Sequence, residues 1–422
     1  MCIRDSYLSV LYPRAGSNDV RATMGEFVSL DVANSSVIST ILRHDTKVTS
    51  YKIALLRAIN DVVISFPDVY TYHQNVLVPL RALADYWIAY YWPFVDPQRP
   101  IYQGRRSQRA GGLNTDIAFR QALSSLRLEW ERSIGTSSGP SDGFFLINDM
   151  KISRKNQLYS PELLQQYHAA VVALCDALEM PICYAGPGKW ALFAKPVKFK
   201  YLQGQGIPLP GTLPEDRCLV INAELWQTFR DMSLWVEALC IHEWCLFTER
   251  LLQEQPEQAI NRGDIYRLLT DRPDNRRPLT WERNHIDILL LEGTEFICPW
   301  TERSITQGVS YHLDHLMPLS VYPMNELWNL APSDPHFNAH QKRDRLPSSQ
   351  RLARALPHLA HTYANYMTSR QLAGVINEDV HGRFSTVPQL ISQNRLSFPL
   401  AVSQVVGNFL NDVAIARNLT RF

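Results

Sequence analysis

The chain has 422 residues, of which 45% are hydrophobic and 20% charged, and its formal net charge is +1. This composition is that of an ordinary folded protein, and it excludes a disordered acidic chain and a polycationic tail. At roughly 100–200 residues per domain, the length predicts several folded units. The longest apolar stretches fall short of the about 20 residues that span a bilayer, so we expect no contact with the membrane.

The seven cysteines are scattered along the chain without the spacing of a disulfide framework. Such cysteines are typical of reduced thiols. No secretory signal pattern opens the sequence, and we therefore expect a cytoplasmic protein. Residues 1–6 (MCIRDS) match nothing around them and are left out of the fold prediction.

Helical periodicity dominates the first third of the chain. Helices are predicted over residues 51–65, 78–92 and 116–132. Thr49 and Ser50 can cap the first of these helices, and Pro93 ends the second because proline disfavours helix in the residue before it. Residues 133–143 are rich in Gly, Ser and Pro, and this composition predicts a linker between domains.

The remainder combines helices with short strands. Further helices are predicted over residues 161–178, 222–250, 281–291, 347–370 and 399–414. Short strands are predicted at residues 190–193 and 219–223.

Residues 298–349 stand apart because they hold four of the chain's twelve histidines. Residues 310–316 alternate like a strand, residues 326–330 form a second short strand or turn, and a helix begins at residues 334–335. The predicted order is therefore strand, loop, strand, helix, with polar side chains on the first strand and on the helix.

These polar side chains suit phosphodiester hydrolysis. Carboxylate and amide oxygens are hard ligands of the kind that Mg²⁺ and Mn²⁺ prefer. A neighbouring imidazole can take a proton from water near neutral pH, and a bound metal stabilises charge on the phosphate. Asp314 and His315 are adjacent and can divide this work.

Three separated blocks of sequence carry the pattern. They are residues 314–320 (DHLMPLS), 327–330 (LWNL) and 338–347 (NAHQKRDRLP). Together they closely resemble the HNH (ββα-metal) motif of bacterial HNH endonuclease domain-containing proteins. More weakly, residues 50–58 and 90–93 are similar to the helical region that precedes some HNH domains.

The resemblance implies an α+β fold class, a mainly helical multi-domain protein with an embedded ββα-metal (HNH) nuclease module. The expected units are a helical amino-terminal domain, a linker, a mixed and mainly helical middle domain, the nuclease domain and a helical carboxyl-terminal region. Their bounds are residues 1–132, 133–143, 144–290, 291–350 and 351–422.

The resemblance also implies a role for each site residue. His315 is expected to be the general base, and Asp314 the first metal ligand. Asn329 is expected to brace the loop by hydrogen bonds. Asn338 is expected to be the second metal ligand, with His340 as the alternative. The residues expected to contact nucleic acid are Lys342, Arg343, Arg345 and His312.

The sequence departs from the family pattern in two places. The helix ligand often lies three residues before the lysine, a position that Ala339 occupies here. Asn338 and His340 point about 200° apart on a regular helix, so both could bind one metal only with a local irregularity. Cys298 stands alone, with Thr301 where a CxxC pair would place its second cysteine, so we expect no structural Zn²⁺.

The expected activity is metal-dependent hydrolysis of DNA, with Mg²⁺ or Mn²⁺ as the ion and RNA as a less favoured substrate. By analogy with similar proteins, the resemblance suggests a restriction or antiphage defence role with protein partners from the same system. The alternative is a non-catalytic nucleic-acid- or partner-binding protein in which the HNH module is a scaffold. The oligomeric state is left open.

Other patterns are weaker. His242 and Glu243 lack the second histidine that a zinc protease needs, and the neighbouring Cys240 and Cys245 are more typical of packing in a helix. Two basic runs could contact phosphate, although solvated surface is the default interpretation. These runs are Lys195, Lys198 and Lys200, and Arg105, Arg106 and Arg109.

Overall fold

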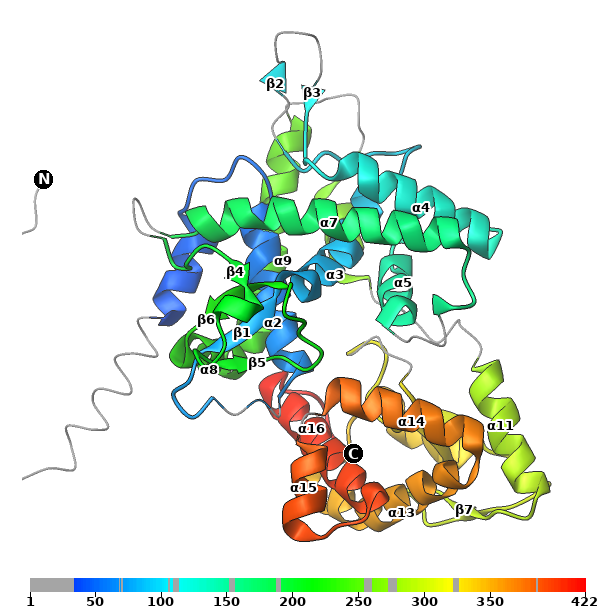
Figure 1. Cartoon of the computed structure of the whole chain (residues 1–422). Helices are drawn as coiled ribbons and strands as arrows, with labels where there is room; N and C mark the ends of the chain where they lie inside the picture. The colour runs from blue at the N-terminus through cyan, green and yellow to red at the C-terminus, as the bar shows by residue number, and fades with distance from the viewer. Residues whose placement is uncertain are drawn as a thin grey trace, which may run out of the picture.

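The computed structural model describes most of the chain from residue 34 onward. The described residues are 34–67, 69, 71–104, 107–108, 114–151, 156–186, 191–253, 260–271, 279–321, 326–384 and 386–422. They form two bodies, each with its own hydrophobic core, which lie one above the other in Figure 1. We call residues 34–271 the amino-terminal body and residues 279–422 the carboxyl-terminal body.

The amino-terminal body is a cluster of helices around α2. After a helical segment at residues 34–43, its helices are α2 (Tyr51–Ser65), α3 (Leu80–Tyr91), α4 (Arg120–Ile134), α5 (Asp142–Lys151), α7 (Pro161–Tyr184), α8 (Ala223–Asp231), α9 (Ser233–Gln253) and α10 (Arg262–Thr270), with the 3₁₀ turns η1 (Trp92–Val95) and η2 (Phe199–Tyr201). Every residue of α2 except Lys52 is buried, which is why its sequence is apolar on all sides.

A small sheet lies at one side of this helical cluster. Its strands follow the order β4 (Val197–Lys198), β6 (Arg217–Ile221), β1 (Val76–Pro79) and β5 (Ile207–Pro208). β1 runs antiparallel to β6 and parallel to β5. A separate pair, β2 (Ser107–Gln108) and β3 (Asn114–Thr115), projects from the top of the body in Figure 1.

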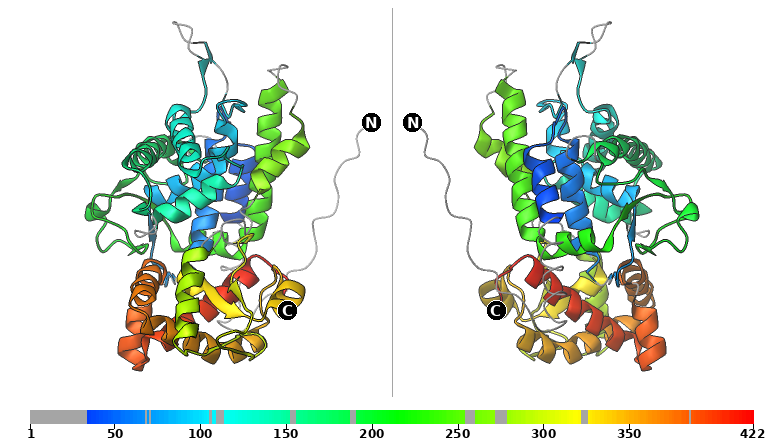
Figure 2. Two further views of the ribbon diagram at one scale, coloured as in Figure 1. Left: turned by 90° about the vertical axis from the view of Figure 1, so that its right-hand side faces the viewer. Right: turned by 90° about the vertical axis from the view of Figure 1, so that its left-hand side faces the viewer.

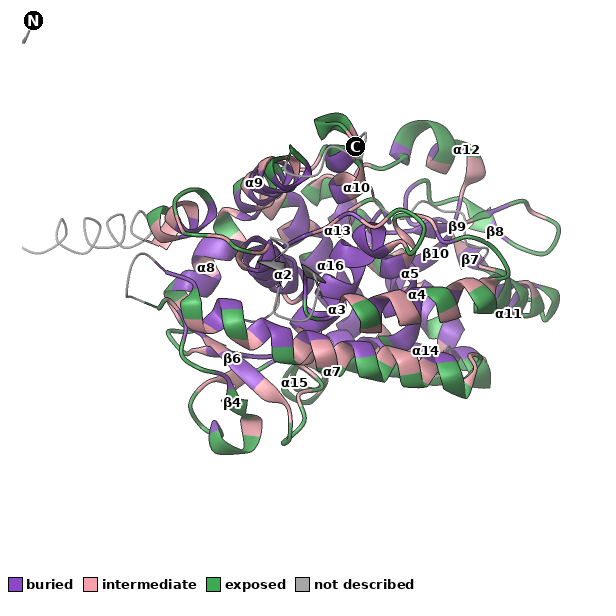
Figure 3. Cartoon of the chain, turned by 90° about the horizontal axis from the view of Figure 1, so that it is seen from above, coloured by how far each residue is buried: buried purple, intermediate pink, exposed green. Residues whose placement is uncertain are grey.

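The carboxyl-terminal body packs short strands against long helices. Its elements are α11 (Thr280–Leu291), β7 (Phe296–Ile297), β8 (Ser304–Ile305), β9 (His312–His315), η3 (Leu327–Asn329), β10 (Leu330–Ser333), α12 (Pro335–Phe337), η4 (Asn338–Lys342), α13 (Ser349–Thr368), α14 (Arg370–Arg383), α15 (Val387–Asn394) and α16 (Phe398–Ala416). Trp328 lies fully buried at its centre, edge-on to Phe384 and Phe409. Figure 3, in which the molecule is seen from above, shows buried residues on both α2 and α16 and exposed residues along α7.

Most predicted helices appear within a few residues of their expected bounds, and the mainly helical α+β class is confirmed. The helix predicted over residues 222–250 is divided at Met232 into α8 and α9. Residues 191–193 of the strand predicted at 190–193 are not in a strand, and residue 190 lies outside the described part. Within the described residues, no helix has the length and apolar character needed to cross a bilayer.

The core of the amino-terminal body does not divide at residues 133–143, where a linker between domains is predicted. One apolar cluster extends from Ile38 to Leu269 across this segment. Trp92 Nε1 donates a hydrogen bond to Ser138 Oγ at 2.6 Å, and Arg127 donates one to the Ser138 carbonyl at 3.2 Å. The polar segment is therefore a tight connection between α4 and α5, fixed by hydrogen bonds that its composition does not reveal.

Two arginines of the carboxyl-terminal body bind the amino-terminal body. Arg417 is paired with Asp61 of α2 at 2.7 Å and with Glu237 of α9. Arg383 donates a hydrogen bond to the Ser65 carbonyl at 2.8 Å. Figure 2 shows the two bodies in contact from both sides, so these bonds fix one body on the other.

Replacing Arg417 by methionine should destabilise the protein by about 3–5 kcal/mol, because the buried carboxylate of Asp61 loses its cation. Urea denaturation measures this change, with the exposed Arg370→Met on α14 as the control that leaves the midpoint unchanged. Equal midpoints for the two variants would show that Arg417 does not hold the bodies together.

Candidate active site

The predicted strand–loop–strand–helix segment forms a compact unit in the carboxyl-terminal body. β9 and β10 pair antiparallel, with His315 opposite Leu330 and His312 opposite Ser333. α12 follows β10 directly and continues into η4. The 3₁₀ turn η3 stands where a second strand or turn was predicted, immediately before β10.

Asn329 holds the loop that follows β9. Its side chain is fully buried, and its Oδ1 accepts a hydrogen bond from the backbone N–H of Met317 at 2.7 Å. Its Nδ2 donates to the carbonyl of the same residue at 3.2 Å. The backbone N–H of Leu316 also donates to the Asn329 carbonyl. These bonds fix the chain direction immediately after His315.

Asp334 caps the helix that follows β10. Its Oδ1 accepts hydrogen bonds from the backbone N–H groups of His336 and Phe337 at 2.9 and 3.1 Å, and Pro335 occupies the first helical position. The Phe337 N–H, with the Arg303 guanidinium, lowers the pKa of the Asp334 carboxyl. The Asp334 N–H donates to the buried Cys298 Sγ, which ties the cap to the strand region.

The helix widens into a π turn at η4. The Arg343 N–H donates to the Asn338 carbonyl five residues earlier, at 2.9 Å, and Arg343 then adopts a positive φ of 52°. A π turn holds one more residue than an α turn, and such turns are frequent at functional sites. The family pattern places the helix ligand three residues before the lysine, whereas Asn338 is four residues before Lys342. The π turn is a local irregularity at this position.

Lys342 and Asp314 form a buried ion pair that joins η4 to β9. The Lys342 Nζ lies 3.0 Å from Asp314 Oδ1, and the two side chains are 1% and 5% exposed. The same ammonium donates to the His315 carbonyl at 2.8 Å. Trp300 Nε1 donates to the other carboxylate oxygen of Asp314 at 3.1 Å. Both carboxylate oxygens therefore have a donor.

This placement differs from the expectation that Lys342 contacts nucleic acid. The ammonium is directed into the protein, because a carboxylate as buried as Asp314 requires a compensating cation. The other residues expected to contact nucleic acid are more open. His312 and Arg343 are exposed, and Arg345 is half-buried.

His315 is next to Asp314 on β9 but on the opposite face, because successive strand side chains alternate. It is 6% exposed. On the helix, Asn338 is half-buried, and His340 is exposed with its ring 4.7 Å from that of His336.

The structure connects Asp314, the His315 backbone and Lys342 by direct hydrogen bonds, and it places Asn329 at the adjoining loop. Within residues 279–321 and 326–384, no hydrogen bond or ion pair joins Asn338 or His340 to Asp314. Sequence reasoning missed Trp300, which lies in the block that carries Cys298. Nothing in its local sequence indicates a bond to a carboxylate fourteen residues away.

Across the described residues, no three His, Cys, Asp or Glu side chains form a group that could hold a metal ion. The metal site predicted from the sequence has two protein ligands, the Asp314 carboxylate and the Asn338 amide, and so it would not form a group of three such side chains. On α9, Cys240 and Cys245 are buried whereas His242 is exposed, so these three side chains do not converge.

Only one of the two basic runs predicted from the sequence falls within the described residues. Lys198 and Lys200 both pair with Glu215, at 2.6 and 2.9 Å. Arg105, Arg106 and Arg109 lie outside the described residues.

Comparison with protein families matches residues 31–269 to a domain of unknown function, DUF8808. The match covers more than half of the 422 residues. The chain belongs to the DUF8808 family. The DUF8808 region coincides with the core of the amino-terminal body and ends before α11, so β9, β10 and η4 lie beyond it. No curated protein and no solved structure matched the chain.

The buried ion pair of Lys342 and Asp314 leads to a prediction about stability. Lys342→Met should cost about 3–5 kcal/mol, because it leaves the Asp314 charge buried without a cation. The double variant Lys342→Met/Asp314→Asn should regain most of this loss, since the charge is then gone while the amide oxygen can still accept from Trp300.

Urea denaturation of the single and double variants measures the coupling, and Lys200→Met in the exposed pair with Glu215 is the matched control. A Lys342→Met variant as stable as Lys200→Met would contradict the structural role of the pair.

Proposed function

We propose that this protein is a metal-dependent HNH endonuclease that hydrolyses DNA phosphodiester bonds. The observation that carries the proposal is the ββα unit: β9 and β10 pair, and Lys342 ties the following helix to Asp314. The three sequence blocks that resemble the HNH motif begin, in chain order, on β9, on η3 and on η4. The embedded nuclease module, the cytoplasmic location and a role in restriction or antiphage defence are parts of the same proposal.

The donor set suits a hard divalent cation. Asp314 Oδ1 already faces a positive charge, that of Lys342, so this position accepts a cation. Asp314 and Asn338 would hold Mg²⁺ or Mn²⁺, with His340 as the alternative on the π turn. A bound ion supplies electrostatic stabilisation of the negative charge that develops on the phosphate.

Besides its ion pair with Asp314, Lys342 has a second role in this proposal. Asp314 can bind a divalent ion only if Lys342 gives up Oδ1, and the ammonium then has donors available for a phosphate oxygen. The buried pair is in this view the resting state of the site. It keeps the Asp314 carboxylate compensated until substrate and ion arrive.

His315 acts as the general base and takes a proton from the attacking water. The backbone after His315 is held by the two side-chain hydrogen bonds that Asn329 makes with the main chain of Met317. The exposed His312 and Arg343 are the surface residues of the same body that we assign to the DNA backbone, with DNA preferred over RNA. The DUF8808 region would restrain or direct the nuclease, together with protein partners of the defence system.

A second function follows from the burial of the same residues. His315 is 6% exposed, and both oxygens of Asp314 already have protein donors. These two facts favour a non-catalytic nucleic-acid- or partner-binding protein in which the ββα unit is a scaffold.

Cleavage of supercoiled plasmid distinguishes the two functions. The wild-type protein should nick or linearise plasmid with Mg²⁺ or Mn²⁺ and lose this activity with a chelator. His315→Ala should lower the rate by about 10²–10⁴-fold, the usual effect of losing a general base. His358→Ala, at a half-buried position on α13, is the matched control and should keep the wild-type rate.

Binding of DNA without cleavage, unaffected by His315→Ala, would favour the scaffold. Equal inertness of wild type and His315→Ala on plasmid, single-stranded DNA and RNA would end the nuclease assignment.

A further inference from the structure

Two histidines lie side by side on the surface of the helix that follows β10. His336 belongs to α12 and His340 to η4, and both residues are exposed. Their ring centroids are 4.7 Å apart, and the ring planes are tilted by 50°. Residues four positions apart share one face of a helix, which is why the two imidazoles meet.

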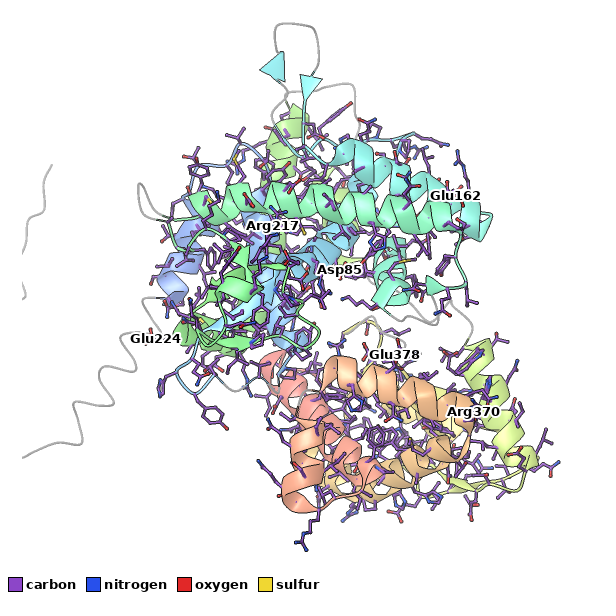
Figure 4. All side chains as sticks on the ribbon, in the orientation of Figure 1. Asp85, Glu162, Arg217, Glu224, Arg370 and Glu378 are labelled. Carbon is purple, nitrogen blue, oxygen red and sulfur yellow. The ribbon has the colours of Figure 1, made fainter. Side chains whose placement is uncertain are left out.

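The two imidazoles are not bonded to other side chains or to the backbone. Among the described residues, no hydrogen bond or ion pair involves the ring of His336 or His340. Arg217 on β6, labelled in Figure 4, shows the contrast, because its guanidinium binds Asp176 at 2.7 Å and Glu179 at 2.5 Å on α7. The ring nitrogens of the two histidines are therefore open to a ligand from solution.

The separation of the two rings suits one metal ion between them. With a zinc–nitrogen bond of about 2.0–2.1 Å and an angle of roughly 90–110° at the ion, two bound imidazoles have centroids about 4.5–5.2 Å apart. The observed 4.7 Å lies within this range. The rings already stand at the distance that a shared ion requires.

Imidazole nitrogens select a different ion from the one proposed at Asp314. Carboxylate and amide oxygens suit Mg²⁺ and Mn²⁺, whereas imidazole suits Zn²⁺, Ni²⁺ and Cu²⁺. Two histidines four residues apart on one helix face are also the pair with which zinc-protease helices bind their metal. Here the pair supplies two ligands, and water would fill the remaining positions around the ion.

The histidine pair and Asn338 lie on different sides of the helix. Asn338 is two positions from each histidine and is half-buried, whereas both histidines are exposed. On a regular helix a residue two positions away points about 200° away. Among the described residues, no hydrogen bond or ion pair joins His340 to Asp314. An ion on the histidine pair would therefore be separate from an ion held by Asp314 and Asn338.

We propose that His336 and His340 together form a binding site for a divalent transition-metal ion such as Zn²⁺. The bound ion joins α12 to η4 across Asn338, so it restrains the start of the π turn. It also occupies His340, which leaves Asn338 as the helix ligand for the ion proposed at Asp314. The histidine site itself does not depend on nuclease activity.

Calorimetric titration of Zn²⁺ into the full chain, in the presence of excess Mg²⁺, tests the site. The wild-type protein should bind Zn²⁺, and His336→Ala and His340→Ala should each weaken this binding at least tenfold, because each removes one of two ligands. Asp314→Asn should bind Zn²⁺ as tightly as wild type.

His381→Ala is the matched control and should leave Zn²⁺ binding unchanged. It removes an exposed histidine of α14 whose Nδ1 is already hydrogen-bonded to the Asn377 carbonyl at 2.7 Å. Circular dichroism of each variant verifies that the fold is retained.

Amide hydrogen exchange locates the ion in the chain. The backbone amides of residues 336–342 should exchange more slowly with Zn²⁺ than without it, because the chelate closes across this part of the helix. The protection should be absent from His336→Ala and His340→Ala and present in Asp314→Asn.

Several results would overturn the inference. They are an absence of Zn²⁺ binding by the wild-type protein, binding that either histidine variant leaves unchanged, an equal loss with His381→Ala, and wild-type exchange at residues 336–342 that Zn²⁺ does not slow. Loss of Zn²⁺ binding in Asp314→Asn would show that the histidine pair is not a separate site.

Discussion

The buried ion pair of Lys342 and Asp314 is the interaction on which the candidate site depends. The Asp314 side chain is 5% exposed, and a carboxylate buried to this extent is stabilised by a neighbouring cation, which here comes from η4. The same ammonium bonds to the His315 carbonyl, so one lysine fixes the helix, the acidic residue and the strand end together. The pair is also where the nuclease and scaffold proposals diverge, because a nuclease must exchange Lys342 for a metal ion.

Local signals predicted much of the fold. Helical periodicity and the proline after Trp92 placed α2 and α3 within two residues of their expected bounds, because these signals lie within the local sequence. Ser50 precedes α2, but its hydroxyl makes no cap hydrogen bond to the helix and is bonded to the Tyr91 hydroxyl instead. The order of β9, β10 and the helix was likewise visible from alternation and from Asp334-Pro335. Composition alone indicated a linker at residues 133–143, but it could not show the hydrogen bonds by which Trp92 and Arg127 hold Ser138 in that segment.

The candidate site was predictable in its residues and not in its bonds. A block of sequence shows that a lysine follows an asparagine on a helix, but not that its ammonium reaches an acid 28 positions earlier. The hydrogen bond from Trp300 to Asp314 depends on tertiary packing. The π turn that begins at Asn338 depends on one extra residue in the helical turn. α14 connects the site with the contact between the bodies: its Asp379 accepts the Leu327 N–H of η3, which ends at Asn329, and its Arg383 donates to the Ser65 carbonyl of α2.

Calorimetric titration of Mn²⁺ into the full chain tests most directly whether Asp314 can accept a divalent ion in place of Lys342. The account predicts that wild type and His315→Ala bind the ion with similar affinity, because the base is not a ligand. Asp314→Asn, which removes the charge and retains the shape, should lose that binding. Wild-type protein that does not bind Mn²⁺, or an Asp314→Asn variant that binds it as tightly as wild type, would contradict the account.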